Sequence, residues 1–358
     1  MKTLFLLFSA ILSLSCNRPS KQIASQTVDS SFIQKTNNTG LKDNFKTGEV
    51  IPSVDLIGDS SQKFALFLPK KYSESQKFPI VIFFDPHAEG TIPLNLYAKL
   101  AERFQFILMA SNTSKNGLDI QQTNAISNNL IHEALSRLSV DKNNISLCGF
   151  SGGAKVALSC GAMNPDVNSV IYCGAAMQFN PSHKINLLGF AGKRDMNYMD
   201  LVSFEWSLEK APFKHFLIEW NGKHEFPSAD VFENAFAFLN TGEIENYPEK
   251  QVKITPQKVE EELGVKQKYI NALQSNDVSW WKAEIKFLNT NKKNDLMYKR
   301  LLGFISLACY SFSSKLLAQN DLANAEKILS IYKLADPTNK ACEEFILELE
   351  KRKMNIKK

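Results

Sequence analysis

Short, continuous apolar runs alternate with segments of helical periodicity over residues 61–239. Each apolar run is bounded by polar or turn-forming residues, which is typical of a strand that is covered on both faces in a parallel sheet. The predicted strands are 64–69, 78–84, 106–110, 145–149, 169–174, 185–191 and 214–220.

Helical periodicity is clearest in residues 123–138, whose apolar side chains share one face. Further helices are predicted over 94–103, after residue 153, over 198–210 and over 229–239. The last of these follows Ser228, a residue type that favours a helix N-cap, and contains three phenylalanines that would pack on the sheet. Strands that alternate with helices imply right-handed crossovers, so we predict an α/β fold with a mostly parallel sheet covered by helices on both faces.

The pattern changes towards the C-terminus. Residues 243–256 are polar, contain two prolines and are predicted to be a linker, and residues 257–358 read as successive amphipathic helices. The clearest stretch, 301–334, has small alanines at facing positions, an Asn-Asp turn and a proline after its second helix. It resembles one tetratricopeptide-type helical hairpin. The alternative is a helical extension that packs on the main domain.

The N-terminus resembles a bacterial lipoprotein signal. Lys2 precedes an apolar run over residues 4–14, and Ser15 stands directly before Cys16. The run is too short to span a bilayer as a stable helix. Leu12 lies one residue earlier than the common pattern places it. We predict cleavage before Cys16 and a lipid on its sulfur, which would anchor the protein in the bacterial cell envelope, periplasmic or surface-exposed. An ordinary secretory signal is the alternative.

The predicted organisation is therefore a signal peptide (1–16), a flexible polar tether (17–48), an α/β domain (49–242), the linker (243–256) and a helical region (257–358). The tether is rich in Ser, Asn, Thr, Lys and Gln and has too little apolar surface to fold. The 358 residues have a formal charge of +5, from 42 Lys and Arg against 37 Asp and Glu. The basic residues form no stripe, so nucleic acid is not an expected partner.

The remaining cysteines fall into two groups. Cys148, Cys160 and Cys173 lie in apolar strand or helix contexts, where a buried thiol that packs as a small hydrophobe is expected. Cys309 and Cys342 could pair across helices, although the cysteines have no framework spacing.

The sequence Gly149-Phe-Ser151-Gly152-Gly is the strongest chemical motif in the chain. It follows an apolar run and leads into helical periodicity, so it reads as strand, sharp turn and helix. This is the pattern of a nucleophile elbow, in which a strained turn exposes the serine hydroxyl. The N–H of Gly152 would then point towards a developing oxyanion. The alternative is a structural glycine-rich turn.

A serine that transfers acyl groups needs a base to take its proton and a carboxylate to orient that base. Asp195 follows the predicted strand 185–191 and a glycine turn, and His224 follows the strand 214–220. Asp195 could instead cap the next helix and leave the role of the acid to Asp200. His215 is an alternative to His224 as the base, but it lies at the start of a strand. His132 lies on the surface of a predicted helix.

The order of these motifs resembles that of the α/β-hydrolase superfamily, in which serine, acid and histidine follow in this sequence. The closing segment Gly222-Lys-His-Glu-Phe-Pro227 is most similar to the serine esterase and polyhydroxyalkanoate-depolymerase branch. Dienelactone-hydrolase-like and prolyl-oligopeptidase-like proteins remain close. The resemblance covers roughly residues 61–239 and implies the catalytic set Ser151, Asp195 and His224.

The resemblance also implies a second oxyanion donor, in the loop after the strand 78–84. Here His87 and Ala88 occupy that loop, and the N–H of Ala88 is the expected donor beside that of Gly152, because Pro86 has no N–H. The alternative is a plain turn with His87 exposed. His87, Phe150 and Phe226 are candidate residues of a substrate pocket.

Three functions follow as hypotheses. The first is an esterase that acts on a small or extended ester through an acyl-enzyme, and the second is a serine peptidase of the prolyl-oligopeptidase type. The third is a non-catalytic envelope scaffold that binds a protein partner through its helical C-terminus. No cofactor is expected, and the scattered histidines and the absence of a Cys-x-x-Cys pair predict no metal site.

Overall fold

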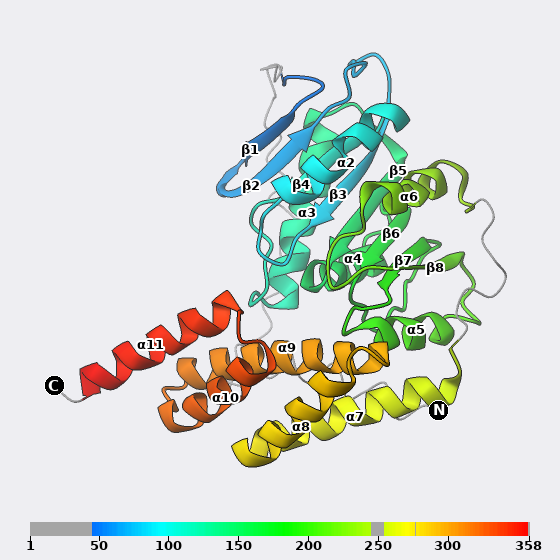
Figure 1. The fold of residues 1–358 in the computed structure, drawn as a ribbon. Helices are drawn as coiled ribbons and strands as arrows, with labels where there is room; N and C mark the ends of the chain where they lie inside the picture. The colour runs from blue at the N-terminus through cyan, green and yellow to red at the C-terminus, as the bar shows by residue number, and fades with distance from the viewer. Residues whose placement is uncertain (1–44, 245–253, 276, 357–358) are drawn as a thin grey trace, which may run out of the picture.

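Eight strands form one sheet in the computed structural model, which describes residues 45–244, 254–275 and 277–356 (Figure 1). The strand order is β1-β2-β4-β3-β5-β6-β7-β8. Strand β2 pairs antiparallel with β1 and β4, and the other neighbours are parallel. The strands are β1 (Val50–Leu56), β2 (Asp59–Phe67), β3 (Phe78–Phe84), β4 (Ile107–Ser111), β5 (Val140–Phe150), β6 (Ser169–Cys173), β7 (Asn186–Gly192) and β8 (His215–Trp220).

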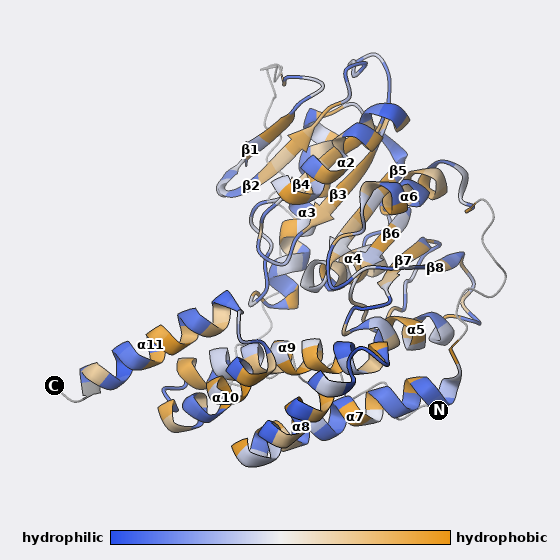
Figure 2. Cartoon of the chain, in the orientation of Figure 1, coloured by the Kyte–Doolittle hydropathy of each residue, from blue (hydrophilic) through white to orange (hydrophobic). Residues whose placement is uncertain are grey.

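Helices cover both faces of the sheet. One face packs against α2 (Thr91–Phe104) and α6 (Ala229–Thr241), and the other packs against α3 (Ile120–Arg137), α4 (Gly152–Met163) and α5 (Tyr198–Ser207). Strand β3 is apolar throughout and β4 nearly so, as their colour in Figure 2 shows, because both of their faces are removed from water. The predicted fold class is confirmed: the chain has a mostly parallel α/β sheet covered by helices on both faces, followed by a C-terminal helical region.

The sequence patterns did not reveal strand β1. Its residues are mostly exposed or half-buried and include Pro52, so no continuous apolar run marks the strand. A proline is tolerated there because β1 lies at the edge of the sheet.

Helix α6 packs its aromatic residues on the sheet as predicted. Phe232, Phe236 and Phe238 are buried, and the ring of Phe232 stacks on Tyr97 of α2 with 3.8 Å between centroids. Ser228 is the N-cap residue, but its side chain makes no capping hydrogen bond to the backbone. Burial of its aromatic face therefore holds this helix in place more than its cap does.

The described helices of the C-terminal region are α7 (Pro256–Ser275), α8 (Val278–Asn291), α9 (Leu296–Ala318), α10 (Leu322–Ala335) and α11 (Lys340–Ile356). They share one apolar core, and α7 also packs against α5. Among the described residues, α9 alone is long and apolar enough to cross a membrane. Because α9 packs against its four neighbours and buries residues such as Leu301 and Ile305 among them, it is the core helix of this region.

All five cysteines in the described residues are free and buried. Burial was expected for Cys148, Cys160 and Cys173, but the suggested pairing of Cys309 with Cys342 is wrong. The two thiols lie near each other in the apolar core, and burial raises the pKa of each. Cys16, the predicted signal 1–16, nearly all of the tether 17–48 and most of the linker 243–256 lie outside the described residues.

Candidate active site

Ser151, His224 and Asp195 lie in one hydrogen-bonded line. The Oγ of Ser151 is 2.9 Å from Nε2 of His224, and Nδ1 of His224 is 3.0 Å from both carboxylate oxygens of Asp195. The carboxylate can only accept, so Nδ1 carries the imidazole proton and Nε2 is left to accept the serine hydroxyl. The structure thus brings the three predicted residues together with a basic nitrogen facing the serine.

The serine is held in a strained turn between β5 and α4. Ser151 has φ 53° and ψ −118°, a conformation that costs a non-glycine residue about 1–3 kcal/mol. Its N–H donates to the carbonyl of Cys173 at the end of β6, which ties the turn to the neighbouring strand. This geometry is the elbow that the glycines around Ser151 predict.

Asp195 lies in the acid loop, which we define as residues 193–197 between β7 and α5. The side chain is 1% exposed. Its Oδ1 also accepts the N–H of Asn197 at 2.8 Å, so the carboxylate stabilises the turn that leads into α5 as well as contacting the histidine. The alternative acid Asp200 points elsewhere and is bonded to Lys266 of α7 at 2.6 Å.

His224 lies in the loop between β8 and α6, and contacts from helix α2 and from the acid loop hold that loop in place. Tyr97 of α2 donates its hydroxyl proton to the carbonyl of Pro227 at 2.7 Å, and the N–H of Arg194 in the acid loop donates to the carbonyl of Gly222 at 2.9 Å. The competing His215 is bonded instead to Glu205 of α5 at 2.8 Å, and that hydrogen bond raises the pKa of His215.

The other candidate histidine, His132, is exposed on α3, as the sequence suggested. It has no part in the line of hydrogen bonds formed by Ser151, His224 and Asp195.

Gly174 is a site residue that the sequence patterns did not single out. It directly follows β6 and has φ 68°. A Cβ built there would lie 2.9 Å from Cε2 of Phe150, 3.1 Å from Oδ2 of Asp195 and 3.2 Å from Nδ1 of His224. Its carbonyl accepts the side-chain amide of Asn197 at 2.8 Å. The position and backbone angle both favour glycine, but only the assembled loops show this.

The structure contradicts the expectation for Ala88. Its N–H donates to the carbonyl of Asp85 at 3.2 Å, and its φ is 62°, so the loop closes as a turn. The Oδ1 of Asp85 accepts the N–H of His87 at 2.8 Å and that of Glu89 at 3.3 Å. Burial raises the pKa of Asp85, and these two N–H groups oppose the rise. The N–H of Ala88, which was expected to face an oxyanion, is therefore directed at the carbonyl of Asp85.

Gly152 remains the donor candidate, since it opens α4 directly after Ser151. The side-chain amide of Asn116 lies over it: a Cβ built on Gly152 would be 1.8 Å from Oδ1 of Asn116. The N–H of Asn116 donates to the carbonyl of Pro86 at 2.9 Å, so the loop after β4 joins the loop after β3 next to the elbow. No sequence pattern marked Asn116, because only the contact between the two loops brings its side chain next to Gly152.

Two predicted pocket aromatics border the histidine. The ring of Phe150 lies 4.7 Å from that of His224 and 5.0 Å from that of Phe226, measured between centroids, and both phenylalanines are half-buried. The third candidate, His87, is exposed, as the plain-turn alternative had it. Phe150 and Phe226 thus form an apolar wall on one side of the imidazole.

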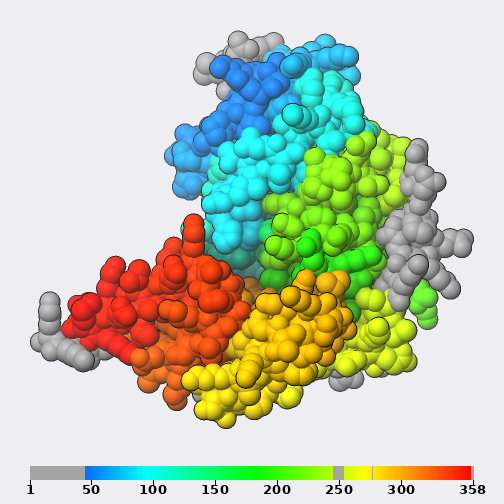
Figure 3. All heavy atoms as spheres, viewed as in Figure 1, coloured from blue at the N-terminus to red at the C-terminus, as the bar shows by residue number. Residues whose placement is uncertain are grey.

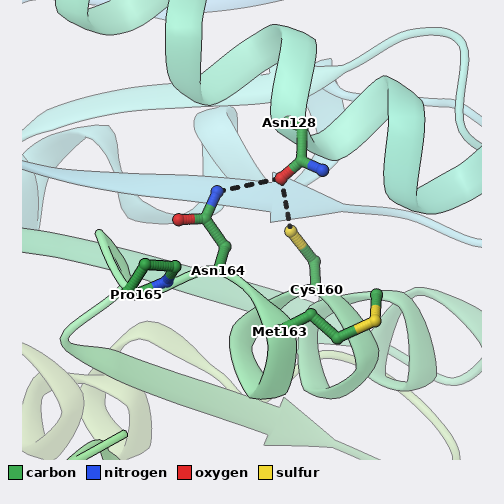
Figure 4. A pocket seen from close by; sticks show the side chains of 5 residues that line it. All are labelled: Asn128, Cys160, Met163, Asn164 and Pro165. Carbon is green, nitrogen blue, oxygen red and sulfur yellow. Dashed lines mark hydrogen bonds between the residues drawn. The ribbon is translucent and has the colours of Figure 1, made fainter. Parts of the chain in front are cut away.

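A separate pocket of about 260 Å³ lies between α3 and α4 (Figure 4). The Oδ1 of Asn128 accepts hydrogen bonds from Asn164 at 2.9 Å and from the thiol of Cys160 at 3.6 Å. Burial raises the pKa of Cys160 to about 12, so its thiol is protonated at neutral pH. The pocket lies towards the end of α4 that is remote from Ser151. Over the described ranges, no three His, Cys, Asp or Glu side chains form a metal-binding group.

No protein-family model matches the sequence, and the curated proteins contain no match. Several solved structures are similar in part. A thermophilic esterase of Thermogutta terrifontis is 16% identical over 56% of this chain and 95% of its own, with a TM-score of 0.41. An esterase of Pyrobaculum calidifontis is 9% identical over 56% and 87%, with a TM-score of 0.44. A structure described as a dienelactone hydrolase from Klebsiella pneumoniae is 15% identical over 54% and 99%, with a TM-score of 0.43.

Proposed function

We propose that this protein is a serine hydrolase that cleaves carboxylic esters. The observation that supports the proposal is the line from Ser151 through His224 to Asp195, with a serine held in a strained turn and an imidazole that faces it through its basic nitrogen. A structural serine would need neither the strain nor the buried carboxylate behind the histidine.

In the proposed reaction, Oγ of Ser151 attacks the ester carbonyl carbon while Nε2 of His224 takes the hydroxyl proton. The negative charge on the carbonyl oxygen is stabilised by the N–H of Gly152 and the positive end of α4. Collapse of the tetrahedral intermediate breaks the ester C–O bond, and His224 gives its proton to the departing alcohol. Water, activated by the same imidazole, then attacks the acyl-enzyme and releases the acid. Asp195 holds the imidazole in one tautomer and stabilises its cation throughout.

The test uses the purified protein with a series of p-nitrophenyl esters and a fluorophosphonate probe. We expect hydrolysis and covalent labelling of Ser151, and loss of both in Ser151→Ala. The kcat of Asp195→Asn should be about 10⁴-fold below that of wild type, as in a well-studied serine protease, because the imidazole adopts the wrong tautomer. Ester hydrolysis by Ser151→Ala at the wild-type rate, or a labelled residue other than Ser151, contradicts the proposal.

We also propose that Cys16 carries a lipid that anchors the protein in the bacterial cell envelope. The support is the sequence alone: the charged start, the short apolar run and the small residue before the cysteine. The polar segment that follows would hold the hydrolase away from the bilayer surface.

A further inference from the structure

The acid loop that contains Asp195 is in contact with the C-terminal helices. Figure 1 shows α7 and α9 passing below the end of the domain where α5 begins, and Figure 3 shows the helical region packed directly against it. Met196 of the acid loop packs against the apolar core that the helices share. A catalytic triad does not require the C-terminal helices, yet these helices contact the loop that carries Asp195.

A buried ion pair fixes the first residue of the loop. Nε and Nη2 of Arg300 on α9 donate to the two carboxylate oxygens of Glu262 on α7, at 2.8 and 2.6 Å. The remaining nitrogen Nη1 donates to the carbonyl of Lys193 at 2.9 Å. Arg300 is 4% exposed and Glu262 is fully buried. A guanidinium is the one side chain whose planar fork serves a carboxylate and a carbonyl at once.

A second buried cation fixes the other side of the loop. Nζ of Lys266 on α7 is fully buried, donates to the carbonyl of Met196 and pairs with Oδ2 of Asp200 at 2.6 Å. The same carboxylate attracts Lys155 of α4, whose pKa is lowered by burial. Asp200, in the first turn of α5, is thus paired with the helical region through Lys266.

These contacts fall on both sides of Asp195. Residues 193 and 196 are held through their carbonyls and residue 200 through its side chain, by partners 107, 70 and 66 positions away in the chain. If the loop moved, buried charges would lose their hydrogen bonds, which is costly in a dry interior. The loop is therefore held where Asp195 meets His224.

We propose that Arg300 and Lys266 are positioning residues, and that the helical region clamps the acid loop so that Asp195 holds His224 in the reactive geometry. This proposal rests on the proposed function of Ser151. It gives the helical region a part in the hydrolase site itself.

The main test variant is Arg300→Met with Glu262→Met, which removes both buried charges together and leaves neither unpaired. The matched control is Arg137→Met with Glu133→Met. Glu133 is buried and Arg137 is half-buried, and Arg137 also donates to a backbone carbonyl, that of Asp55 at 3.1 Å, but this pair lies on α3.

We expect the variant to lower kcat by about 10- to 100-fold, because a displacement of about 1 Å at a triad costs about that much. KM should change less than kcat, since the apolar wall beside His224 is untouched. The control should stay within about twofold of wild type at temperatures where both remain folded, because additive effects of distant changes do not reach the site. A similar loss of kcat in the variant and the control overturns the proposal.

A double-mutant cycle separates positioning from general destabilisation. If Arg300 acts through Asp195, the same two substitutions should slow fluorophosphonate labelling far less in an Asp195→Asn background than in the wild-type background. Equal slowing in both backgrounds contradicts the proposal. If the double variant fails to fold, Arg300→Lys takes its place: one ammonium keeps the charge opposite Glu262 but cannot also hold the Lys193 carbonyl, so a smaller loss of kcat is expected.

The final readout does not depend on activity. The Nδ1 proton of His224, hydrogen-bonded to Asp195, should give a downfield proton resonance in wild type, identified by its loss in His224→Ala. The resonance should broaden or shift in the Arg300 and Glu262 variant and persist in the control. An unchanged resonance in the variant overturns the clamp. A wild-type protein that shows the resonance but does not react at Ser151 overturns the proposed function alone.

Discussion

Replacing Gly174 with alanine changes the backbone and the active site at the same time. Gly174 has φ 68°, and its missing Cβ would fall against Phe150, Asp195 and His224, at 2.9, 3.1 and 3.2 Å from their nearest atoms. The left-handed backbone costs an alanine about 1–2 kcal/mol. Because this penalty falls on one residue of a large domain, we expect Tm to drop by about 2–8 °C.

The contacts of the added methyl group with the active site should also lower catalysis, which the backbone strain at position 174 alone would not do. The new methyl group has no flexible side-chain end to displace, so the imidazole, the carboxylate or the Phe150 ring must shift by a few tenths of an ångström. A shift of about 1 Å at reacting groups costs about 10²-fold, so we expect kcat to fall by about 10-fold or somewhat more. The bond between Nδ1 of His224 and Asp195 is the contact most directly disturbed.

The matched control is Gly58→Ala, in the turn between β1 and β2. Gly58 has φ 85°, and a Cβ built there meets no atom within 4 Å. An alanine at position 58 would therefore have the same kind of backbone strain as one at position 174, but far from the triad. Steady-state kinetics on a p-nitrophenyl ester and a thermal melt of both variants make the comparison. If Gly174→Ala retains the kcat of Gly58→Ala, the contacts inferred around Gly174 do not control the triad geometry.

Three further predictions concern stability and anchoring. The hydrogen bond to Glu205 raises the pKa of His215 above the 6.5 of an unfolded chain. The stability that this bond adds is therefore fully present below pH 6.5, and it is lost as the pH rises through the pKa of His215 in the folded protein. Melts between pH 5 and 9 should show His215→Gln less stable than wild type only at the acid end, and a difference that grows towards pH 9 is inconsistent with this. Phe232→Ala should cost about 3–5 kcal/mol in chemical denaturation, whereas the half-exposed Phe287→Ala should cost little; equal losses would argue against the packing described. A metabolic palmitate probe should label the wild-type protein and not Cys16→Ser, and label retained in the variant excludes lipidation at Cys16.

Much of the site could be predicted because its members lie directly after strands. Ser151 follows β5, Asp195 follows β7 and its glycine turn, and His224 follows β8. The carboxyl ends of parallel strands meet at one edge of a sheet, so the residues that follow them are neighbours in space. Apolar runs located those strands well, since both faces of the central sheet are buried. Strand β1 escaped because it lies at the edge and half of its pattern faces water.

The sequence by itself thus determined the sheet except for strand β1, its covering helices and the edge at which Ser151, Asp195 and His224 gather, because these depend on local periodicity and on the order of the strands. Only the tertiary structure decided that Ala88 gives its N–H to Asp85, that Gly174 lies against the imidazole, and that Arg300 reaches Lys193. Each of these depends on the direction of one backbone group or side chain towards a partner that the fold brings near. No pattern within a short stretch of sequence contains such a direction.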